Sequence, residues 1–221
     1  MIRNELTSPS VPVVYVVDDD ASVLESLESL IGCAGWRAAT FASAQQFLSQ
    51  PPGQAPHCLV LDSILPDISG LELQSRIARS QADLPIIFIS AYDDVTTTAS
   101  AMKGGAVEFL TKPFANETLL DAIRYAIDRS RALLDGAVAM GALAGRYKSL
   151  TRREREIMRL VAAGRMNKQI ADDLGISEVT VKAHRGKLMH KMQADSLADL
   201  VRMAMTLGLV ITHHANHRPA P

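Results

Sequence analysis

The sequence predicts an α/β domain built on a five-stranded, parallel, doubly wound sheet, followed by an all-α domain of four helices. Two observations predict this architecture: short apolar runs alternate with helical segments over residues 1–128, and the net charge changes sign between the two parts. Residues 1–128 carry a net charge of −9, and residues 129–221 carry +8. A basic part attracts polyanions through phosphate contacts, whereas an acidic part does not, so we expect the two parts to perform different tasks.

The composition excludes several classes of protein. The chain has 221 residues, 48% of them hydrophobic, and this length allows one or two globular domains. Cys33 and Cys58 are the only thiols, which excludes a disulfide scaffold or a zinc site built on thiols and favours a reducing compartment. The first residues show no signal-peptide pattern, and no stretch approaches the roughly 18 apolar residues of a membrane span. We therefore expect a cytoplasmic protein without membrane contact.

Five apolar runs in the first part have the length of strands. They are Val13–Val17, a weaker run at Trp36–Phe41, Cys58–Leu61, Ile86–Ile89 and Val107–Leu110. Helical periodicity lies between them, at about 21–34, 43–49, 70–79 and 94–104, and again from 116 onward. Strands without polar alternation are covered on both faces, and alternating strand–helix units of this length form a parallel sheet.

Polar residues follow four of the predicted strands. Asp18–Asp20 come after the first strand, Asp62 after the third, Ser90 after the fourth and Lys112 after the fifth. The carboxyl ends of parallel strands meet at one edge of the sheet, where ligands bind, so these side chains are expected to converge. Clustered carboxylates repel one another unless a cation compensates them, and an all-oxygen set suits Mg²⁺ or Mn²⁺. The lysine and the hydroxyl would then face phosphoryl oxygens.

These residues carry a family resemblance. Residues 12–128 resemble the receiver domain of two-component response regulators, and the resemblance covers about half of the chain. The matching motifs are Val16–Asp20, Leu61–Asp62 with Leu65–Gly70, Ile89–Ala91 and Phe109–Phe114. Each motif alone is weak, but together, in order and each at a strand end, they are specific. The resemblance implies the strand order 2-1-3-4-5.

The resemblance also implies which residues react and which hold the metal. Asp62 would be the phosphoacceptor for a sensor histidine kinase or a small phosphodonor. Asp18, Asp19 and Asp62 would hold Mg²⁺, with Asp19 the more direct ligand, and the backbone carbonyl of Ile64 would supply another oxygen. This agrees with the chemistry, because phosphoryl transfer to a carboxylate depends mainly on positioning and on charge neutralisation.

Three further residues would respond to the phosphoryl group. Lys112 would pair with one of its oxygens, Ser90 would hydrogen-bond another, and Phe109 would occupy the aromatic switch position. The chain departs from the family pattern at Ile64, two residues after the acceptor, where related receivers commonly carry Arg, Asn or Met. Metal binding uses the carbonyl of this residue and is unaffected, but the departure removes a polar group from the mouth of the pocket.

Some acidic residues have a structural interpretation beside the functional one. Asp20 precedes a helical segment and is expected to cap it rather than to bind metal. Asp67, in Leu65–Gly70, is interpreted as a turn residue. For Asp62 and Lys112 a purely structural role is the weaker alternative, because a buried carboxylate rarely shares one sheet edge with other acids.

A linker at 129–148 separates the two domains, and its three glycines make an unbroken helix the less favoured of two alternatives. Thr151 and Glu154 then fit a capping box, and the first helix of the second domain ends at Gly164. Short helices at 168–174 and from Ser177 to about Met192 form a helix-turn-helix. Val181, Leu188 and Met192 mark the inward face of the last of these helices, and the outward face carries cations and small residues.

Residues 149–209 resemble the LuxR-type DNA-binding domain of the FixJ and NarL branch of response regulators. The matching residues are Leu150–Thr151, Arg153–Glu154, Val161, Gly164, Asn167–Lys168, Ile170–Ala171, Leu174, Ile176–Ser177, Thr180–Lys182, His184–Arg185 and Lys191–Met192. The residues expected at DNA are Asn167, Lys168, Thr180, Lys182, Ala183, Arg185, Gly186 and Lys187. Among the cations, Arg185 and also Lys191 are expected to flank the groove-facing side and to contact phosphates. A fourth helix at 196–207 would supply a dimer contact through Leu197, Leu200, Val201 and Ala204, or would only complete the core.

The resulting hypothesis is a phosphorylation-controlled transcription factor. Its expected partners are a sensor histidine kinase, double-stranded promoter DNA, a second copy of the chain and RNA polymerase. Two alternatives stay open. A hydrolase with an aspartyl-phosphate intermediate usually places a second Asp two residues after the nucleophile, where this chain has Ile64. A constitutive DNA-binding protein would lack the acceptor Asp or the Lys, and both are present here. The segments 1–11 and 210–221 are expected to be tails without an assigned function.

Overall fold

The computed structural model describes residues 11–50, 53, 55–80, 84–92 and 94–209. The chain divides into two compact units, which we call the N-terminal unit (residues 1–136) and the C-terminal unit (residues 137–221). The predicted tails lie outside the described residues, apart from Val11. No helix in the described part of the chain is both long and apolar enough to cross a membrane.

The N-terminal unit contains the predicted five-stranded parallel sheet. Its strands are β1 (Val13–Val17), β2 (Arg37–Phe41), β3 (His57–Asp62), β4 (Ile86–Ser90) and β5 (Glu108–Thr111). Their order is β2-β1-β3-β4-β5, which confirms the order that the family resemblance implies. Asp62 pairs with Ile89, and Ser90 pairs with Thr111. This register brings the ends of β3, β4 and β5 to one edge of the sheet.

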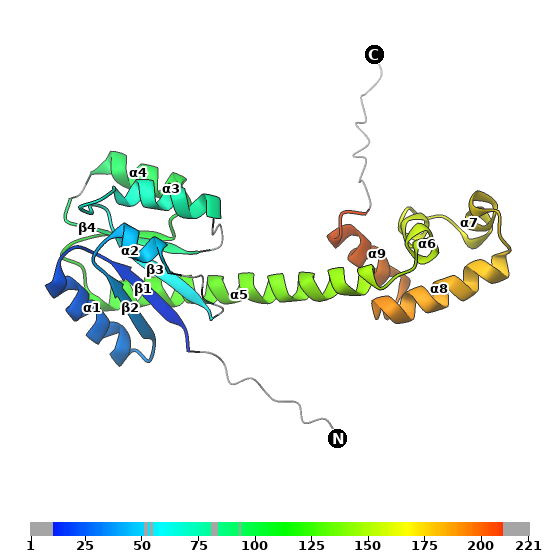
Figure 1. The fold of residues 1–221 in the computed structure, drawn as a ribbon, viewed down its shortest axis with the longest axis horizontal. Helices are drawn as coiled ribbons and strands as arrows, with labels where there is room; N and C mark the ends of the chain where they lie inside the picture. Colours follow the sequence, from blue (N-terminus) through cyan, green and yellow to red (C-terminus); the bar gives the residue numbers. More distant parts are fainter. Residues whose placement is uncertain (1–10, 51–52, 54, 81–83, 93, 210–221) are drawn as a thin grey trace, which may run out of the picture. The chain divides into compact units, whose positions relative to one another are not determined.

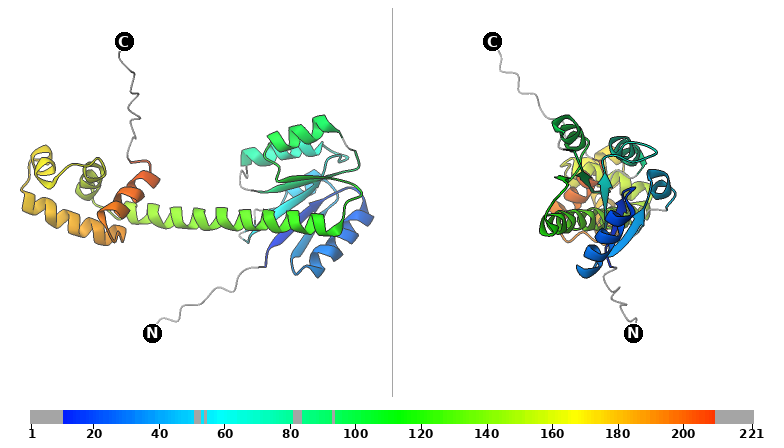
Figure 2. Two further views of the ribbon diagram at one scale, coloured as in Figure 1. Left: turned by 180° about the vertical axis from the view of Figure 1, so that it is seen from behind. Right: turned by 90° about the vertical axis from the view of Figure 1, so that its left-hand side faces the viewer.

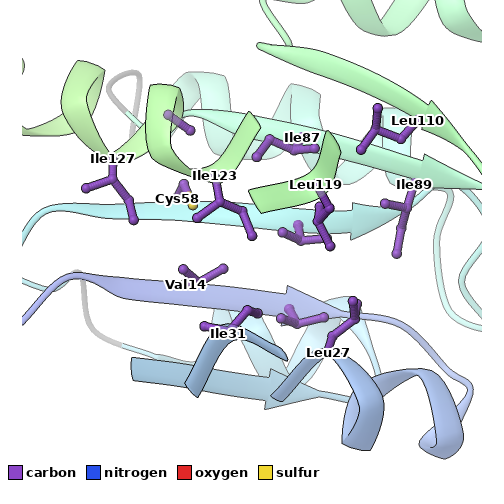
Figure 3. Close-up of a cluster of buried hydrophobic side chains, with 13 residues drawn as sticks. Val14, Leu27, Ile31, Cys58, Ile87, Ile89, Leu110, Leu119, Ile123 and Ile127 are labelled. Carbon is purple, nitrogen blue, oxygen red and sulfur yellow. The ribbon is translucent and has the colours of Figure 1, made fainter. Parts of the chain in front are cut away.

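Helices cover both faces of the sheet (Figure 1; Figure 2). On one face lie α1 (Ala21–Cys33) and the first half of α5 (Asn116–Lys148). On the other lie α2 (Ala44–Leu48), α3 (Gly70–Ser80) and α4 (Val95–Lys103). Figure 3 shows the first of the two resulting cores, where Val14 and Ile87 of the strands meet Ile31 of α1 and Ile123 of α5. Burial on both faces explains why the strands are almost continuously apolar.

Helix starts follow the local signals in the sequence. The Asp20 carboxylate accepts a hydrogen bond from the Ser22 N–H at 2.8 Å, so Asp20 caps α1 as expected. Asp67 does more than form a turn. Its carboxylate accepts hydrogen bonds from the N–H groups of Ala44 and Gln45, and it thereby stabilises the start of α2, more than 20 residues earlier in the chain.

Helix α5 differs from the expectation of a break. It runs without interruption from Asn116 to Lys148 through Gly136, Gly141 and Gly145. Each glycine costs about 1 kcal/mol relative to Ala. Ala, Met and Leu between the glycines favour the helix. Both of its ends are also anchored: Ile123 packs in the core of the N-terminal unit and Tyr147 packs against that of the C-terminal unit. Packing at the ends thus outweighs the local propensity.

Between residues 149 and 209, the C-terminal unit contains four further helices. They are α6 (Arg152–Ala162), α7 (Asn167–Leu174), α8 (Glu178–Met192) and α9 (Leu197–Thr206). The capping box of Thr151 and Glu154 is present, and Gly175 adopts φ +62° in the turn between α7 and α8, a conformation that favours glycine. All four helices contribute to one apolar core, and Leu143 and Tyr147 of α5 pack against it. The end of the predicted linker therefore packs with this unit.

The predicted dimer residues of α9 divide into two groups. Leu200 and Ala204 are fully buried in the core of the C-terminal unit. For these two residues, burial favours the alternative that the helix completes the core. Leu197 is half exposed and Val201 is partly buried, so only this edge of the helix stays available.

Candidate functional site

The candidate functional site of the N-terminal unit is a lysine that bridges two buried carboxylates. Lys112 Nζ lies 2.7 Å from Asp18 Oδ2 and 2.7 Å from Asp62 Oδ2. Asp18 is 1% exposed and Asp62 is 8% exposed. The three residues come from the ends of β1, β3 and β5, so the convergence expected at this edge is confirmed for them. Asp19 is exposed beside Asp18.

The charges in this cluster do not balance. Asp18, Asp19 and Asp62 bring three carboxylates against the single amine of Lys112. Burial raises the pKa of Asp18 above its usual range even though Lys112 and the Asp20 N–H both stabilise its charged form. Burial by itself lowers the pKa of Lys112, but the hydrogen bonds to Asp18 and Asp62 outweigh burial, and this pKa lies above its usual value. The site therefore favours an additional cation.

The backbone around Asp62 is held on two sides. Asp62 Oδ1 accepts a hydrogen bond from the Ile64 N–H at 2.9 Å, which leaves the other oxygen to Lys112. Gly70, at the start of α3, lies against the same turn: a Cβ placed there would sit 2.6 Å from the Asp62 carbonyl oxygen. Only glycine allows this close approach. The turn and α3 thus fix the direction of the Asp62 side chain.

The predicted switch residues lie at the neighbouring strand ends. Ser90 is buried, and its hydroxyl is hydrogen-bonded to the hydroxyl of Ser63, a residue that the sequence did not single out. Phe109 is partly buried and stacks on Phe88, with ring centroids 5.9 Å apart. Sequence reasoning missed Ser63 because its partner depends on the pairing of β3 with β4; its place next to Asp62 was the available signal.

A cavity opens beside this edge of the sheet. It has a volume of about 460 Å³, and Ser63, Ile64, Ser90 and Tyr92 are among the residues that line it. Ile64 is 56% exposed and Tyr92 is 65% exposed, so the residues two positions after Asp62 and after Ser90 lie at the surface. An aliphatic and an aromatic side chain therefore border the approach to the site.

The donor set fits a hard divalent cation. Asp18, Asp19 and Asp62 offer carboxylate oxygens, and the excess of negative charge over Lys112 is the compensation that such an ion would provide. Among the described residues, no three side chains of Asp, Glu, His or Cys gather closely enough to hold an ion by themselves. Mg²⁺ keeps several of its waters and needs only one or two protein carboxylates.

Helix α8 of the C-terminal unit presents the predicted DNA-contact face. Val181, Leu188 and Met192 are buried as expected, and the opposite side is exposed. The predicted DNA contacts that are exposed are Thr180, Lys182, Ala183, Gly186 and Lys187 on this helix, together with Lys168 on α7. Cations separated by small residues leave room for close approach to a groove of double-stranded DNA.

Two predicted cations of α8 are engaged within the protein. Arg185 Nη1 donates to Asn167 Oδ1 at 2.5 Å, so these two predicted DNA contacts are tied to each other. Lys191 Nζ lies 2.7 Å from Glu154 Oε2, and Glu154 is 2% exposed. Its amine thus connects the end of α8 to α6, and its assignment to a flanking phosphate contact stays a prediction.

Two family models match this chain, one over each unit. The family model of the response regulator receiver domain matches residues 14–124, and that of the luxR family of bacterial regulatory proteins matches residues 148–204. Nodulation protein W of Bradyrhizobium diazoefficiens is 45% identical over 91% of this chain and 88% of its own. The transcriptional regulatory protein FixJ of the same species is 39% identical over 89% of this chain and 96% of its own.

Solved structures lead to the same family. The response regulator StyR is 43% identical and matches with a TM-score of 0.79 over 89% of this chain and 99% of its own. Full-length FixJ from B. japonicum is 39% identical and matches with a TM-score of 0.54 over 90% of this chain and 98% of its own. The chain therefore belongs to the two-component response regulators of the FixJ/NarL branch, transcriptional regulators in which a receiver domain precedes a LuxR-type DNA-binding domain.

Proposed function

We propose that Asp62 accepts a phosphoryl group from the phosphohistidine of a sensor kinase in a Mg²⁺-dependent reaction, and that this modification changes dimerisation and binding to promoter DNA. The observation that carries the proposal is the contact of Lys112 with both Asp62 and Asp18 at 2.7 Å. A lysine held between two buried carboxylates at the end of three strands is placed to pair with an anion attached to one of them.

The transfer needs little chemistry from the protein. An oxygen of Asp62 forms a bond to phosphorus while the phosphorus–nitrogen bond of the phosphohistidine breaks, and the departing imidazole takes a proton from solvent. The Ile64 N–H orients the Asp62 carboxylate during the attack. Lys112 remains beside the new phosphoryl oxygens and neutralises part of their charge.

Asp18, Asp19, Asp62 and the carbonyl of Ile64 would hold Mg²⁺ or Mn²⁺. When bound, such an ion supplies charge neutralisation for the transferring phosphoryl oxygens. The excess of carboxylates over Lys112 supports this assignment. Both metals accept the same oxygen ligands, so either would serve at this site.

The response to phosphorylation would begin at Ser90 and Phe109. Ser90 would donate a hydrogen bond to the phosphoryl group, its loop would move toward Asp62, and Phe109 would follow into the space behind it. The output is binding to double-stranded promoter DNA by Lys182 and its exposed neighbours, as a homodimer and in contact with RNA polymerase. The exposed edge of α9 at Leu197 and Val201 is the part of the predicted dimer surface that supports such a contact.

Mass spectrometry after incubation with acetyl phosphate and Mg²⁺ tests the proposal. We expect one added phosphate in the wild type and none in Asp62→Ala. Asp67→Asn is the matched control, because Asp67 is exposed and contacts α2 rather than Lys112, and it should be phosphorylated normally. Phosphate on another residue while Asp62 is intact would refute the assignment. DNA binding that is equal with and without the phosphodonor would favour the constitutive alternative.

A further inference from the structure

Two serines at the ends of β3 and β4 form a buried pair next to the phosphorylation site. Ser63 is 7% exposed and Ser90 is 2% exposed, and Ser63 Oγ donates a hydrogen bond to Ser90 Oγ at 2.8 Å. The backbone of Ser63 is held on both sides: its N–H donates to the Ile89 carbonyl and its carbonyl accepts from the Gly70 N–H, each at 3.0 Å. Ser63 is therefore a fixed partner rather than a mobile one.

The hydroxyl of Ser90 is fully engaged as an acceptor in this arrangement. A serine hydroxyl has two lone pairs, and here they receive the Ser63 hydroxyl and the Tyr92 N–H, the latter at 3.1 Å. Both serines line the 460 Å³ cavity, together with Leu71 of α3 and Thr97 of α4, whereas Asp62 is not part of its lining. The resting hydroxyl is thus held on the side of α3 and α4.

We propose that Ser63 acts as a latch: its hydrogen bond holds the Ser90 hydroxyl in the resting position. This bond would lower the affinity of the site for a phosphoryl group, because it must break before Ser90 can reach that group. The inference rests on the proposed role of Ser90 as a donor to the phosphoryl group. To reach an oxygen on Asp62, Ser90 Oγ leaves Ser63, and the hydrogen bond between the two hydroxyls is lost. Ser63 acts only through Ser90, so it is a positioning residue and has no contact with the phosphoryl group.

Calorimetric titration of the full-length chain with beryllium fluoride, a phosphoryl mimic, at saturating Mg²⁺ tests the latch. Ser63→Ala should bind the mimic about fivefold more tightly, the ratio that corresponds to one net hydrogen bond of about 1 kcal/mol. Ser90→Ala should bind it more weakly. The double variant should bind the mimic with the same affinity as Ser90→Ala alone, because Ser63 can act only through the Ser90 hydroxyl, which both variants lack.

Controls separate the latch from a general loosening of the fold. Ser63→Thr keeps the hydroxyl and should bind the mimic like the wild type. Thermal unfolding without ligand reports whether each variant is folded. If Ser63→Ala does not fold, Ser63→Cys replaces it, because its side chain has a similar volume and is a weaker donor. It should also bind the mimic more tightly than the wild type, by a smaller factor. Without Mg²⁺ or mimic, the Tyr92 amide should exchange its hydrogen faster in Ser63→Ala, because Ser90 is no longer held beneath it.

The outcomes are distinct. Weaker binding of the mimic by Ser63→Ala would show that Ser63 contacts the mimic itself. If Ser63→Ala changes the affinity equally in the wild type and in Ser90→Ala, Ser63 acts elsewhere. Either result overturns the latch. An effect of Ser90→Ala with none of Ser63→Ala also overturns the latch and leaves the proposed switch intact. No effect of Ser90→Ala removes the proposed role of Ser90, and the latch with it.

Discussion

Both units of this protein place a lysine amine 2.7 Å from a buried carboxylate, yet the two clusters differ in charge. In the C-terminal unit, Lys191 meets one carboxylate, Glu154, which also accepts the Thr151 N–H in a capping box. In the N-terminal unit, Lys112 meets two carboxylates, Asp18 and Asp62. The first cluster is neutral, whereas the second retains negative charge.

The pKa directions follow from this difference. Burial raises the pKa of Glu154, but Lys191 and the capping interactions with Thr151 outweigh it and hold this pKa below its usual value. The pKa of Asp18 shifts the other way and lies above its usual value. Burial and the nearby Asp62 outweigh the stabilisation of its charged form by Lys112, which Asp18 shares with Asp62. A paired lysine thus holds the fold together where the charges balance, and it leaves negative charge for a ligand to compensate where they do not.

The largest effect expected from the comparison is a difference in rescue by Mg²⁺. Lys191→Met leaves Glu154 buried without a cation and should lower the free energy of unfolding by about 3 kcal/mol, with or without Mg²⁺. Lys112→Met should also destabilise the protein, but Mg²⁺ should recover much of the loss, because the ion can compensate Asp18 and Asp62. Urea unfolding followed by circular dichroism, with and without Mg²⁺, measures both.

Two results would contradict this contrast. One is recovery of Lys191→Met by Mg²⁺, which would mean that the ion binds at Glu154. The other is loss of Mg²⁺ affinity in Lys112→Met, which would assign the lysine to the metal rather than to the phosphoryl group.

The next effect concerns the free and the engaged cations of α8. Lys182 is exposed, and Lys182→Ala should weaken specific DNA binding by about 1–3 kcal/mol if it contacts a base edge. Arg185 is tied to Asn167, and Arg185→Ala should weaken binding to all sequences alike and reduce the salt slope. Fluorescence anisotropy with specific and random duplexes at several salt concentrations distinguishes them. Equal behaviour of the two variants would show that the groove-facing side has been misassigned.

A smaller effect concerns the lifetime of the phosphoryl group. Hydrolysis needs a water held in line with the phosphorus–oxygen bond, and the residues that border the approach are Ile64 and Tyr92. The aliphatic side chain of Ile64 cannot orient a water molecule, and the bulky Tyr92 can shield the phosphoryl group, so we expect slow self-dephosphorylation. Ile64→Asn should shorten the half-life about tenfold by supplying one orienting hydrogen bond, and Tyr92→Ala should shorten it by opening the site. Loss of label from the phosphorylated protein measures this, and unchanged or longer half-lives in both variants would refute the idea.

The smallest effect is a pH dependence of the neutral cluster. Because the pKa of Glu154 lies below its ordinary value of 4.5, its stabilisation is complete above that value and is lost as the pH falls through the pKa of the folded state. The difference in unfolding free energy between the wild type and Glu154→Gln should therefore be constant near neutral pH and shrink below about pH 4.5. Chemical unfolding across pH 3–7 tests this, and a difference that grows with acidification has the wrong sign.

Much of the N-terminal site could be predicted because its signals are local. Apolar runs define the strands, and the residue after each run lies at the same edge of a parallel sheet, so Asp18, Asp62 and Lys112 could be brought together without coordinates. The helix starts could be predicted equally well, since Asp20 and Thr151 accept hydrogen bonds from backbone N–H groups two or three residues away.

The sequence by itself thus determined the fold class, the edge of the sheet that carries the chemistry and the outward face of α8, because periodicity and caps depend on neighbours along the chain. Only the tertiary structure decided the partners: Ser63 with Ser90, Lys191 with Glu154, Asp67 with the start of α2, and the burial of Leu200 and Ala204. The reason is physical. A sequence pattern tells which side of an element faces inward, but the group that a side chain meets there is set by the packing of elements that are distant in the chain.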